Sequence, residues 1–496
     1  MPERQTPFWF LNMDVISQVE RLIFSRFPHQ PTDGQREACR AIVNFLYAPD
    51  PKSAFILKGY AGTGKTSLVS SLIRVAPQLR LKTQLLAPTG RAAKVLANYA
   101  ESKAYTIHKK IYMTVIDSYG VMHMARALNK HSYTLFIVDE ASMIGGEDVS
   151  EVGGHRSLLE DLIDYVQDGH HCRLMLIGDS AQLPPVGSNE SPALDEACLS
   201  AISDLSITQY ELTEVVRQRE ESGILHNATL LRRQVASLDS YSSPHLPFFD
   251  LRGMPDVRRL DGIDLWDAMN NAFGLQDLEN VAVVTRSNKR ANLFNQSIRN
   301  RILFREGEIN AGDFVMVVKN NYYWMDKDSE ISFIANGDIA EVLSVRNYQA
   351  LYGFHFVDAT LRFVDYPDQP AFDCKLILET LHSESPSLTK EEYHQLYVAV
   401  MEDYAELPTK ADRLRELQKN PYFNALQVKF SYALTCHKTQ GGQWKTIFID
   451  PGFIVDDMID KDLLRWLYTA ITRATDQVYL INFDDKFFTS EKEDEG

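Results

Sequence analysis

Residues 59–66 (GYAGTGKT) constrain the fold more than any other part of the chain. They join residues 53–58 (SAFILK), which have the apolar run of a buried strand, to residues 67–75 (SLVSSLIRV), which have the pattern of a helix. A glycine-rich turn between a strand and a helix curls so that its backbone N–H groups point at phosphate oxygens. The alternative, a flexible loop that matches by chance, does not require these flanks. The chain is therefore predicted to bind a nucleoside triphosphate.

Each part of this loop has a predicted role. The ammonium group of Lys65 can reach the β- and γ-phosphates, and the Thr66 hydroxyl can bind Mg²⁺. The helix that follows adds the partial positive charge of its first turn. The backbone around the phosphates comes from Gly59, Ala61, Gly62, Thr63 and Gly64. ATP and Mg²⁺ are thus the expected cofactors.

Composition places the chain among ordinary globular proteins. Its 496 residues suffice for two to four domains, and 45% are hydrophobic. No apolar run approaches transmembrane length, and the charged N-terminus does not read as a signal peptide. Five scattered cysteines without a CxxC pair argue against a zinc site, an iron–sulfur cluster or a disulfide framework, and they favour a cytoplasmic location. They are Cys39, Cys172, Cys198, Cys374 and Cys436.

The formal net charge of −16 speaks against a protein that coats duplex DNA. Net charge governs solubility and non-specific attraction, however, rather than the chemistry of one groove. The acidic tail at residues 491–495 (EKEDE) contributes to the balance and is predicted to be disordered. The charge leaves room for a protein that grips a single strand in a lined channel.

Short apolar runs alternate with helical stretches along the chain, which predicts parallel sheets covered on both faces. The runs fall into two groups, before about residue 210 and after about residue 279, so we expect two α/β cores. Residues 111–124 read as a β-hairpin around Asp117–Gly120. Residues 341–424 read as a small β-rich barrel followed by a helix from Thr389, which begins a capping box. The apolar runs cover residues 81–88, 133–140, 172–179, 280–286, 446–450 and 477–483.

Two further segments carry chemistry. Residues 136–140 form an apolar strand that ends in Asp139 and Glu140. Asp139 is placed to hold Mg²⁺, and Glu140 to act as the base that activates the attacking water. Residues 178–186 (GDSAQLPPV) follow another strand; they read either as a plain turn or as a loop in which Gln182 senses the γ-phosphate.

The order of these segments resembles that of superfamily 1B DNA helicases of the RecD-like branch, which includes the phage Dda helicase and the exonuclease V alpha subunit. The resemblance runs from Gln35 to Ala474, and FIANGDI at residues 333–339 resembles the turn that leads into the inserted barrel of this branch. The matching stretches are residues 32–35, 59–66, 87–93 (APTGRAA), 106–108 (TIH), 139–140, 178–185, 212–218 (LTEVVRQ), 432–442 and 467–474.

The resemblance implies an α/β fold with two RecA-like motor cores. The first core would comprise residues 1–104 and 133–210, with a hairpin insertion at 105–132 that corresponds to the strand-separating pin. The second core would comprise residues 211–340 and 425–496, with a barrel and helical insertion at 341–424. The function of the helical part stays open between bracing the pin, clamping DNA and binding a partner.

The resemblance also implies site residues. Gln35 would read adenine through its amide, and Arg217 and Arg473 would be arginine fingers from the second core. Tyr119, near the hairpin tip, would stack on the first unpaired base or else be an exposed turn tyrosine. His108 and His437 would contact the strand or else be buried structural histidines. The remaining strand contacts would come from Pro88, Thr89, Thr106, Asn288, Thr435 and Lys438.

The sequence therefore predicts an ATP- and Mg²⁺-dependent DNA helicase that acts on single-stranded DNA and on single-strand/duplex junctions. The branch implies 5′-to-3′ movement, which residue spacing does not reveal. Two alternatives stay open: a DNA-binding remodeller that clamps without separating strands, and an RNA helicase. Repair, recombination, replication restart and mobile-element functions are all compatible with the sequence.

Overall fold

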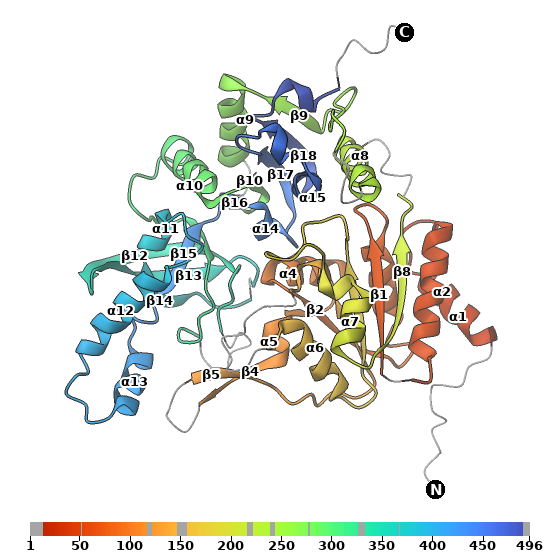
Figure 1. The fold of residues 1–496 in the computed structure, drawn as a ribbon, viewed down its shortest axis with the longest axis horizontal. Coiled ribbons are helices and arrows are strands. Elements are labelled where there is room, and N and C mark those ends of the chain that lie inside the picture. The colour runs from red at the N-terminus through yellow and green to blue at the C-terminus, as the bar shows by residue number, and fades with distance from the viewer. Residues whose placement is uncertain are drawn as a thin grey trace. The chain divides into compact units, whose positions relative to one another are not determined.

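The computed structural model describes residues 13–50, 52–116, 122–145, 156–215, 222–238, 244–275, 278–325, 333–366 and 368–489. The described chain forms two compact units (Figure 1). The first takes in the described parts of Met1–Pro88, Ala92–Tyr112 and Arg126–Glu221. The second takes in those of Thr89–Arg91, Met113–Ala125 and Ser222–Gly496. In these ranges no helix is both long enough and apolar enough to cross a bilayer.

A parallel sheet forms the centre of the first unit. Among the described strands its order is β3-β2-β6-β7-β1-β8, and every neighbouring pair is parallel. β6 and β7 are buried along their whole length, as expected for apolar strands covered on both faces. The strands are β1 (Ser53–Gly59), β2 (Lys82–Ala87), β3 (Ala104–Thr106), β6 (Thr134–Val138), β7 (Arg173–Gly178) and β8 (Ser206–Leu212).

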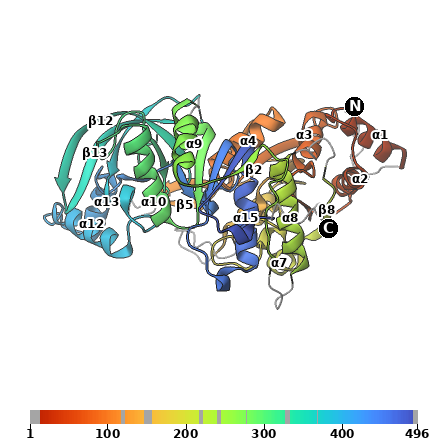
Figure 2. The ribbon, with the colours of Figure 1, turned by 90° about the horizontal axis from the view of Figure 1, so that it is seen from above.

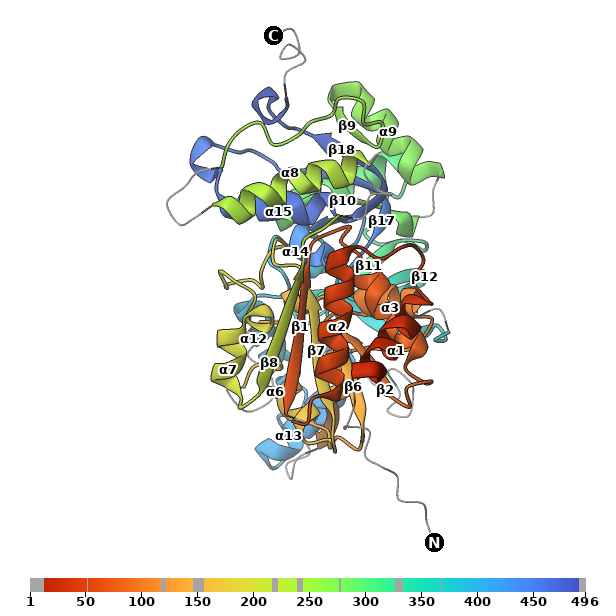
Figure 3. The ribbon, with the colours of Figure 1, turned by 90° about the vertical axis from the view of Figure 1, so that its right-hand side faces the viewer.

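Helices cover both faces of this sheet. Figure 3 shows α1, α2 and α3 on one side of the sheet and α6 and α7 on the other. Apolar side chains of α1, α2 and α3 pack with those of β1, β6 and β7 in one buried core. The helices are α1 (Met13–Phe24), α2 (Asp33–Tyr47), α3 (Lys65–Val75), α4 (Gly90–Ala100), α5 (Ile107–Ile111), α6 (Leu158–Gln167) and α7 (Glu196–Ile202).

The predicted hairpin is present, and one predicted domain boundary is wrong. β4 (Tyr112–Ile116) and β5 (Met122–Arg126) pair as a two-stranded sheet, and the predicted tip with Tyr119 lies outside the described residues. β8 pairs with β1 as far as Leu212, so the first sheet extends past residue 211, where the second core was expected to start.

A second parallel sheet forms the centre of the other unit. In the part of the chain that the structure describes, its order is β16-β10-β17-β18-β9. Figure 2 shows α9 and α10 on one side of these strands and α8 and α15 on the other. The elements are α8 (Gly223–Ser237), β9 (Val257–Leu260), α9 (Gly262–Leu275), β10 (Val281–Thr285), α10 (Asn288–Ser297), β16 (Ala433–Thr435), α14 (Cys436–Thr439), β17 (Trp444–Asp450), α15 (Lys461–Ile471) and β18 (Ala474–Ile481).

The predicted barrel is also present, but it is larger than the predicted insertion. Five described strands close it in the order β11-β12-β13-β14-β15, and two irregularities in β12 let this long strand curl. β11 and β15 lie outside the predicted range of 341–424, since the pairing that closes a barrel has no local sequence signal. The strands are β11 (Phe314–Val317), β12 (Ile339–Leu351), β13 (Phe354–Phe363), β14 (Phe372–Ile377) and β15 (Leu426–Phe430).

Apolar side chains of the barrel and the second sheet form one continuous core, which includes Phe273, Val315 and Phe448. A helical pair, α12 (Lys390–Glu402) and α13 (Lys410–Lys419), follows the short α11 (Glu379–His382). Leu396 and Leu417 of the pair pack on Phe356 of β13 in a separate small cluster. The predicted capping box at Thr389 is formed. The structure thus confirms an α/β fold with two RecA-like parallel-sheet cores and a barrel.

Candidate active site

The phosphate loop joins β1 to α3 as the sequence predicts. Gly62 and Gly64 have positive φ angles of 79° and 85°, a region that residues with a side chain rarely adopt. At Gly59 the requirement is space, because a Cβ there would lie 2.9 Å from Thr63 Oγ1 and 3.0 Å from Lys65 Cγ. The loop is therefore a tight cradle whose shape depends on these glycines.

The loop is held closed by its own side chains. Lys65 Nζ donates to the carbonyl oxygens of Gly59 and, at 3.0 Å, of Tyr60. Thr63 Oγ1 donates to the same Tyr60 oxygen at 2.8 Å. The ammonium group thus rests on neutral carbonyl oxygens, which a phosphate would outcompete because hydrogen bonds between ions are the stronger kind.

Gln35 lies beneath the loop and is fully buried. Its Nε2 donates to Thr63 O at 2.9 Å, and its Oε1 accepts from the Thr32 N–H at 3.0 Å as part of the capping box of α2. Both ends of the amide are therefore engaged within the protein, and Gln35 braces the loop. A contact between Gln35 and adenine stays a prediction.

The loops that carry the candidate catalytic residues leave one edge of the first sheet. β7 lies between β6 and β1, with Val138 opposite Leu176 and Lys58 opposite Gly178. Because the strands are parallel, the phosphate loop after β1, the acidic pair after β6 and the Gly178–Gln182 loop after β7 emerge side by side. The topology thus brings together residues that lie more than 100 positions apart.

The acidic pair at the end of β6 is under electrostatic strain. Burial, with a further contribution from the Glu140 carboxylate, raises the pKa of Asp139 from 3.8 to about 6, although the Lys65 ammonium and the backbone N–H of Glu140 lower it. Glu140 has a positive φ of 53°, which is rare for a residue with a side chain. A bound divalent cation would relieve the repulsion between the two carboxylates, so the site fits the Mg²⁺ that the sequence predicts.

Two buried polar atoms near this edge lack hydrogen-bond partners. Among the described residues, neither Gln182 Oε1 nor Ser142 Oγ has one, although Gln182 is only 6% exposed and Ser142 is fully buried. An unpaired buried polar atom is costly, so such atoms commonly have a role in ligand binding. Sequence reasoning singled out Gln182 and missed Ser142. The signal for Ser142 was its place in the Ala-Ser-Met that follows the acidic pair.

Residues predicted to contact the DNA strand lie further along the same edge of the first sheet. Pro88 and Thr89 follow β2, and Thr106 ends β3, the outermost strand on that side. Thr106 is buried, and its Oγ1 caps α5 by accepting from the Lys109 N–H at 3.2 Å. Burial lowers the pKa of His108 to about 4, so its imidazole is neutral at physiological pH and does not act as a cation toward phosphate.

In the second unit, three residues predicted to contact the DNA strand lie at the end of one short β-strand or just after it. Thr435 ends β16 opposite Thr285 of β10, and His437 and Lys438 lie in α14. Lys438 Nζ donates to Asn336 Oδ1 at 2.7 Å, and burial and the Lys438 charge lower the pKa of His437. Asn288, at the start of α10, instead donates to the Glu384 carbonyl at 3.2 Å.

The structure describes one of the two predicted arginine fingers, Arg473. Arg473 is 5% exposed and donates to Thr469 O at 3.1 Å, Gly442 O at 3.4 Å and Thr472 Oγ1 at 3.2 Å, all within its own unit. Arg217 lies outside the described residues. Neither role is tested by these contacts, and both stay predictions.

Two known protein families match separate parts of this chain. The AAA domain family matches residues 30–243, which include the phosphate loop and the acidic pair, and the UvrD-like helicase C-terminal domain family matches residues 430–481. The ATP-dependent RecD2 DNA helicase of Deinococcus radiodurans is 25% identical over 437 residues. These matches support a RecD-like helicase of superfamily 1B. This agrees with the family that the sequence motifs indicate.

Coverage differs among the relatives of this chain. The match to RecD2 covers 86% of the chain but only 46% of RecD2. Protein R530 of Acanthamoeba polyphaga mimivirus, which is uncharacterised, is 20% identical over 86% of the chain and 94% of its own length. A solved structure of the Bacteroides Pif1 helicase with ADP-AlF3 and single-stranded DNA is 16% identical, with a TM-score of 0.46 over 93% of the chain and 95% of that protein.

Proposed function

We propose that this RecD-like chain is an ATP- and Mg²⁺-dependent DNA helicase that moves 5′-to-3′ on single-stranded DNA and unwinds duplexes from single-strand/duplex junctions. One observation carries the proposal. The phosphate loop, the acidic pair and the Gln182 loop leave the same sheet edge as the loops after β2 and β3. The proposed nucleotide chemistry and the strand contacts of the first unit therefore share one sheet.

In the proposed mechanism the first unit binds ATP and positions the attacking water. Lys65 leaves the carbonyl oxygens of Gly59 and Tyr60 to bind the phosphates. Thr66 and Asp139 would hold Mg²⁺, which would neutralise phosphate charge. Glu140 accepts a proton from the attacking water, and the Gln182 amide, whose oxygen lacks a partner among the described residues, senses the γ-phosphate.

The strand contacts in this mechanism come mainly from neutral groups. His108 is uncharged because burial lowers its pKa to about 4, and Thr89 and Thr435 are hydroxyl residues at or beyond strand ends. Neutral groups and backbone N–H groups contact phosphates without reading bases, which suits a motor that must pass over every sequence. The acidic net charge of the chain is compatible with such contacts.

The decisive experiment compares unwinding of two forked duplexes that carry only a 5′ tail or only a 3′ tail. We expect strand separation from the 5′ tail with ATP and Mg²⁺, and none with a non-hydrolysable analogue. Unwinding from the 3′ tail alone would contradict the direction. DNA-stimulated hydrolysis without strand separation on either fork would support the clamp instead.

A separate comparison is needed to decide whether the protein acts on DNA or on RNA. ATP hydrolysis is measured with single-stranded DNA and with RNA of the same sequence, using Lys65→Ala as the control that removes the phosphate-binding ammonium. We expect stronger stimulation by DNA. Stronger stimulation by RNA would favour the RNA helicase, and unchanged unwinding by Lys65→Ala would contradict the motor altogether.

A further inference from the structure

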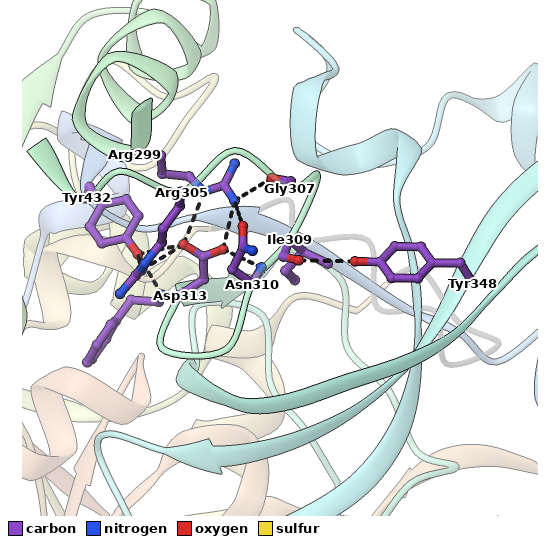
Figure 4. Close-up of polar contacts among 9 residues, drawn as sticks. Arg299, Arg305, Gly307, Ile309, Asn310, Asp313, Tyr348 and Tyr432 are labelled. Carbon is purple, nitrogen blue, oxygen red and sulfur yellow. Dashed lines mark hydrogen bonds and ion pairs between the residues drawn. The ribbon is translucent and has the colours of Figure 1, made fainter. Parts of the chain in front are cut away.

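A buried charged cluster lies where the chain passes from the second sheet into the barrel (Figure 4). Asp313 is fully buried just before β11, and its carboxylate accepts five hydrogen bonds. Arg299 donates through Nε at 3.0 Å and NH2 at 2.9 Å, and Arg305 NH1 donates at 2.8 Å. The Asn310 N–H donates at 2.8 Å and the Tyr432 hydroxyl at 2.9 Å. We call these five residues the Asp313 cluster.

The Tyr432 hydroxyl joins the two crossings between sheet and barrel. It donates to Asp313, and it accepts from Arg305 NH1 and, at 3.0 Å, from the Phe314 N–H. Asp313 and Phe314 lie where the chain enters the barrel, and Tyr432 lies where it returns from β15 to β16. Through one donated and two accepted hydrogen bonds, this hydroxyl group connects the segment that enters the barrel to the segment that leaves it.

Residues of the second sheet unit also hold the return segment, which runs from Phe430 at the end of β15 to Ala433 at the start of β16. Asn295 of α10 accepts from the Ala433 N–H at 2.7 Å and donates to the carbonyl oxygens of Phe430 and Ala433 at 3.2 and 3.0 Å. The Tyr432 carbonyl accepts from the Val283 N–H at 2.9 Å, which begins the pairing of β16 with β10. These bonds hold the return segment to α10 and β10.

The segment that begins at Tyr432 leads to three of the residues predicted to contact the DNA strand. Thr435 is three residues after Tyr432, and His437 and Lys438 follow in α14. A strand of three residues has few ladder bonds of its own, so its position depends on what holds its first residue. The Asp313 cluster is not needed to hold barrel and sheet together, because they already share a hydrophobic core. Buried ion pairs add little stability compared with apolar packing, but they fix geometry.

We propose that Tyr432 is a positioning residue for single-stranded DNA. Its hydroxyl, fixed by Asp313 and Arg305 at the barrel entry, sets the position from which Thr435, His437 and Lys438 contact the strand. The inference rests on the proposed function and names a residue outside the predicted contacts. It also gives the barrel a function, since the barrel supplies the fixed point against which β16 is aligned.

The test uses Tyr432→Phe in the full chain, which removes the hydroxyl and keeps the ring. A hydrogen bond to a buried charge is worth about tenfold in an equilibrium constant, so we expect the half-saturating concentration of a fluorescent oligo(dT) to rise by about that factor. ATP hydrolysis at saturating oligo(dT) should keep its kcat. Arg305→Lys, which retains the charge but not the planar fork, should give a smaller rise in the same direction.

Two controls separate positioning from general stability. Tyr348→Phe is the matched control, since its hydroxyl donates to Ile309 O at 3.1 Å at the margin of the cluster (Figure 4). Val357→Ala removes buried volume from the core that the barrel shares with the second sheet and lowers the melting temperature, and it changes no residue of β16 or of the Asp313 cluster. Both should bind oligo(dT) as the wild type does.

The outcomes distinguish this inference from the proposed function. Wild-type binding by Tyr432→Phe and Arg305→Lys would overturn the inference alone. An equal loss of binding by Val357→Ala would reduce Tyr432 to a structural role and overturn it as well. Absence of oligo(dT) binding by the wild type would overturn the proposed function, and the inference with it.

Discussion

Replacing Asp139 with asparagine should make the nucleotide-free protein more stable while it abolishes the reaction. Asp139 follows β6, where burial and the Glu140 carboxylate raise its pKa from 3.8 to about 6. At neutral pH the wild type must therefore ionise a carboxyl group that the fold disfavours. Asparagine has nearly the same shape and no charge, so it removes this cost together with the proposed Mg²⁺ ligand.

The size and the sign of the effect follow from the pKa. A pKa raised by about two units corresponds to about 3 kcal/mol, and partial exposure of the side chain reduces this to about 1–3 kcal/mol. Because the folded pKa is the higher one, the favourable contribution of the protonated group is present below about pH 4 and is lost as the pH rises through about 6. The stability of Asp139→Asn relative to the wild type should therefore increase as the pH rises from 5 to 7.5.

Denaturant unfolding at pH 5 and at pH 7.5, with ATP hydrolysis measured in parallel, tests this reasoning. Asp250→Asn is a control of opposite sign, since Arg252 lowers the pKa of Asp250 by hydrogen bonds at 2.9 and 3.0 Å. That variant should be less stable than the wild type at pH 7.5. The reasoning about Asp139 is refuted if Asp139→Asn is no more stable than the wild type at pH 7.5, or if the difference does not grow with pH.

Three further predictions concern single side chains. Lys65→Ala should reduce ATP hydrolysis at least about a hundredfold and leave oligo(dT) binding measurable, because the ammonium group serves the phosphates; steady-state hydrolysis and anisotropy titration check this. Arg473→Lys should lower kcat for ATP by a factor on the order of a hundred or more, since an ammonium lacks the planar fork of a guanidinium, while its circular dichroism spectrum stays that of the wild type. Thr389→Ala should cost about 1 kcal/mol of unfolding free energy, measured in urea, by removing the cap of α12, with kcat unchanged.

Patterns that repeat along the chain allowed much of the fold to be predicted. Buried parallel strands such as β6 and β7 are continuous apolar runs, so each is visible without knowledge of its neighbours. The capping box at Thr389 is likewise local. Because the strands are parallel, the residues that follow them meet at one edge, which brings the loops of Asp139 and Gln182 together. The sequence left Gln182 open between a plain turn and a sensor of the γ-phosphate.

Properties that depend on distant partners escaped prediction. β11 and β15 look like ordinary short apolar segments, and only their pairing with each other closes the barrel. The two bonds that hold the Gln35 amide join it to Thr32 and Thr63, so its bracing role depends on the folded loop. The lowered pKa of His108 comes from its burial, which the sequence left as one of two alternatives and which its tripeptide Thr-Ile-His does not decide. In each case the decisive quantity is the environment of the residue rather than its spacing.

The same distinction explains why the charges in this protein are placed as they are. At Asp313 a buried carboxylate meets two guanidinium groups and a hydroxyl, so its charge is compensated and fixes one geometry. At Asp139 the compensation is incomplete, since Glu140 repels the charge and Lys65 offsets it only in part. An uncompensated carboxylate pair is unfavourable in the empty protein and becomes favourable when a cation binds. The first arrangement stabilises a fixed alignment, and the second stores a free energy that ligand binding can release, as the proposed cycle of ATP binding and hydrolysis would require.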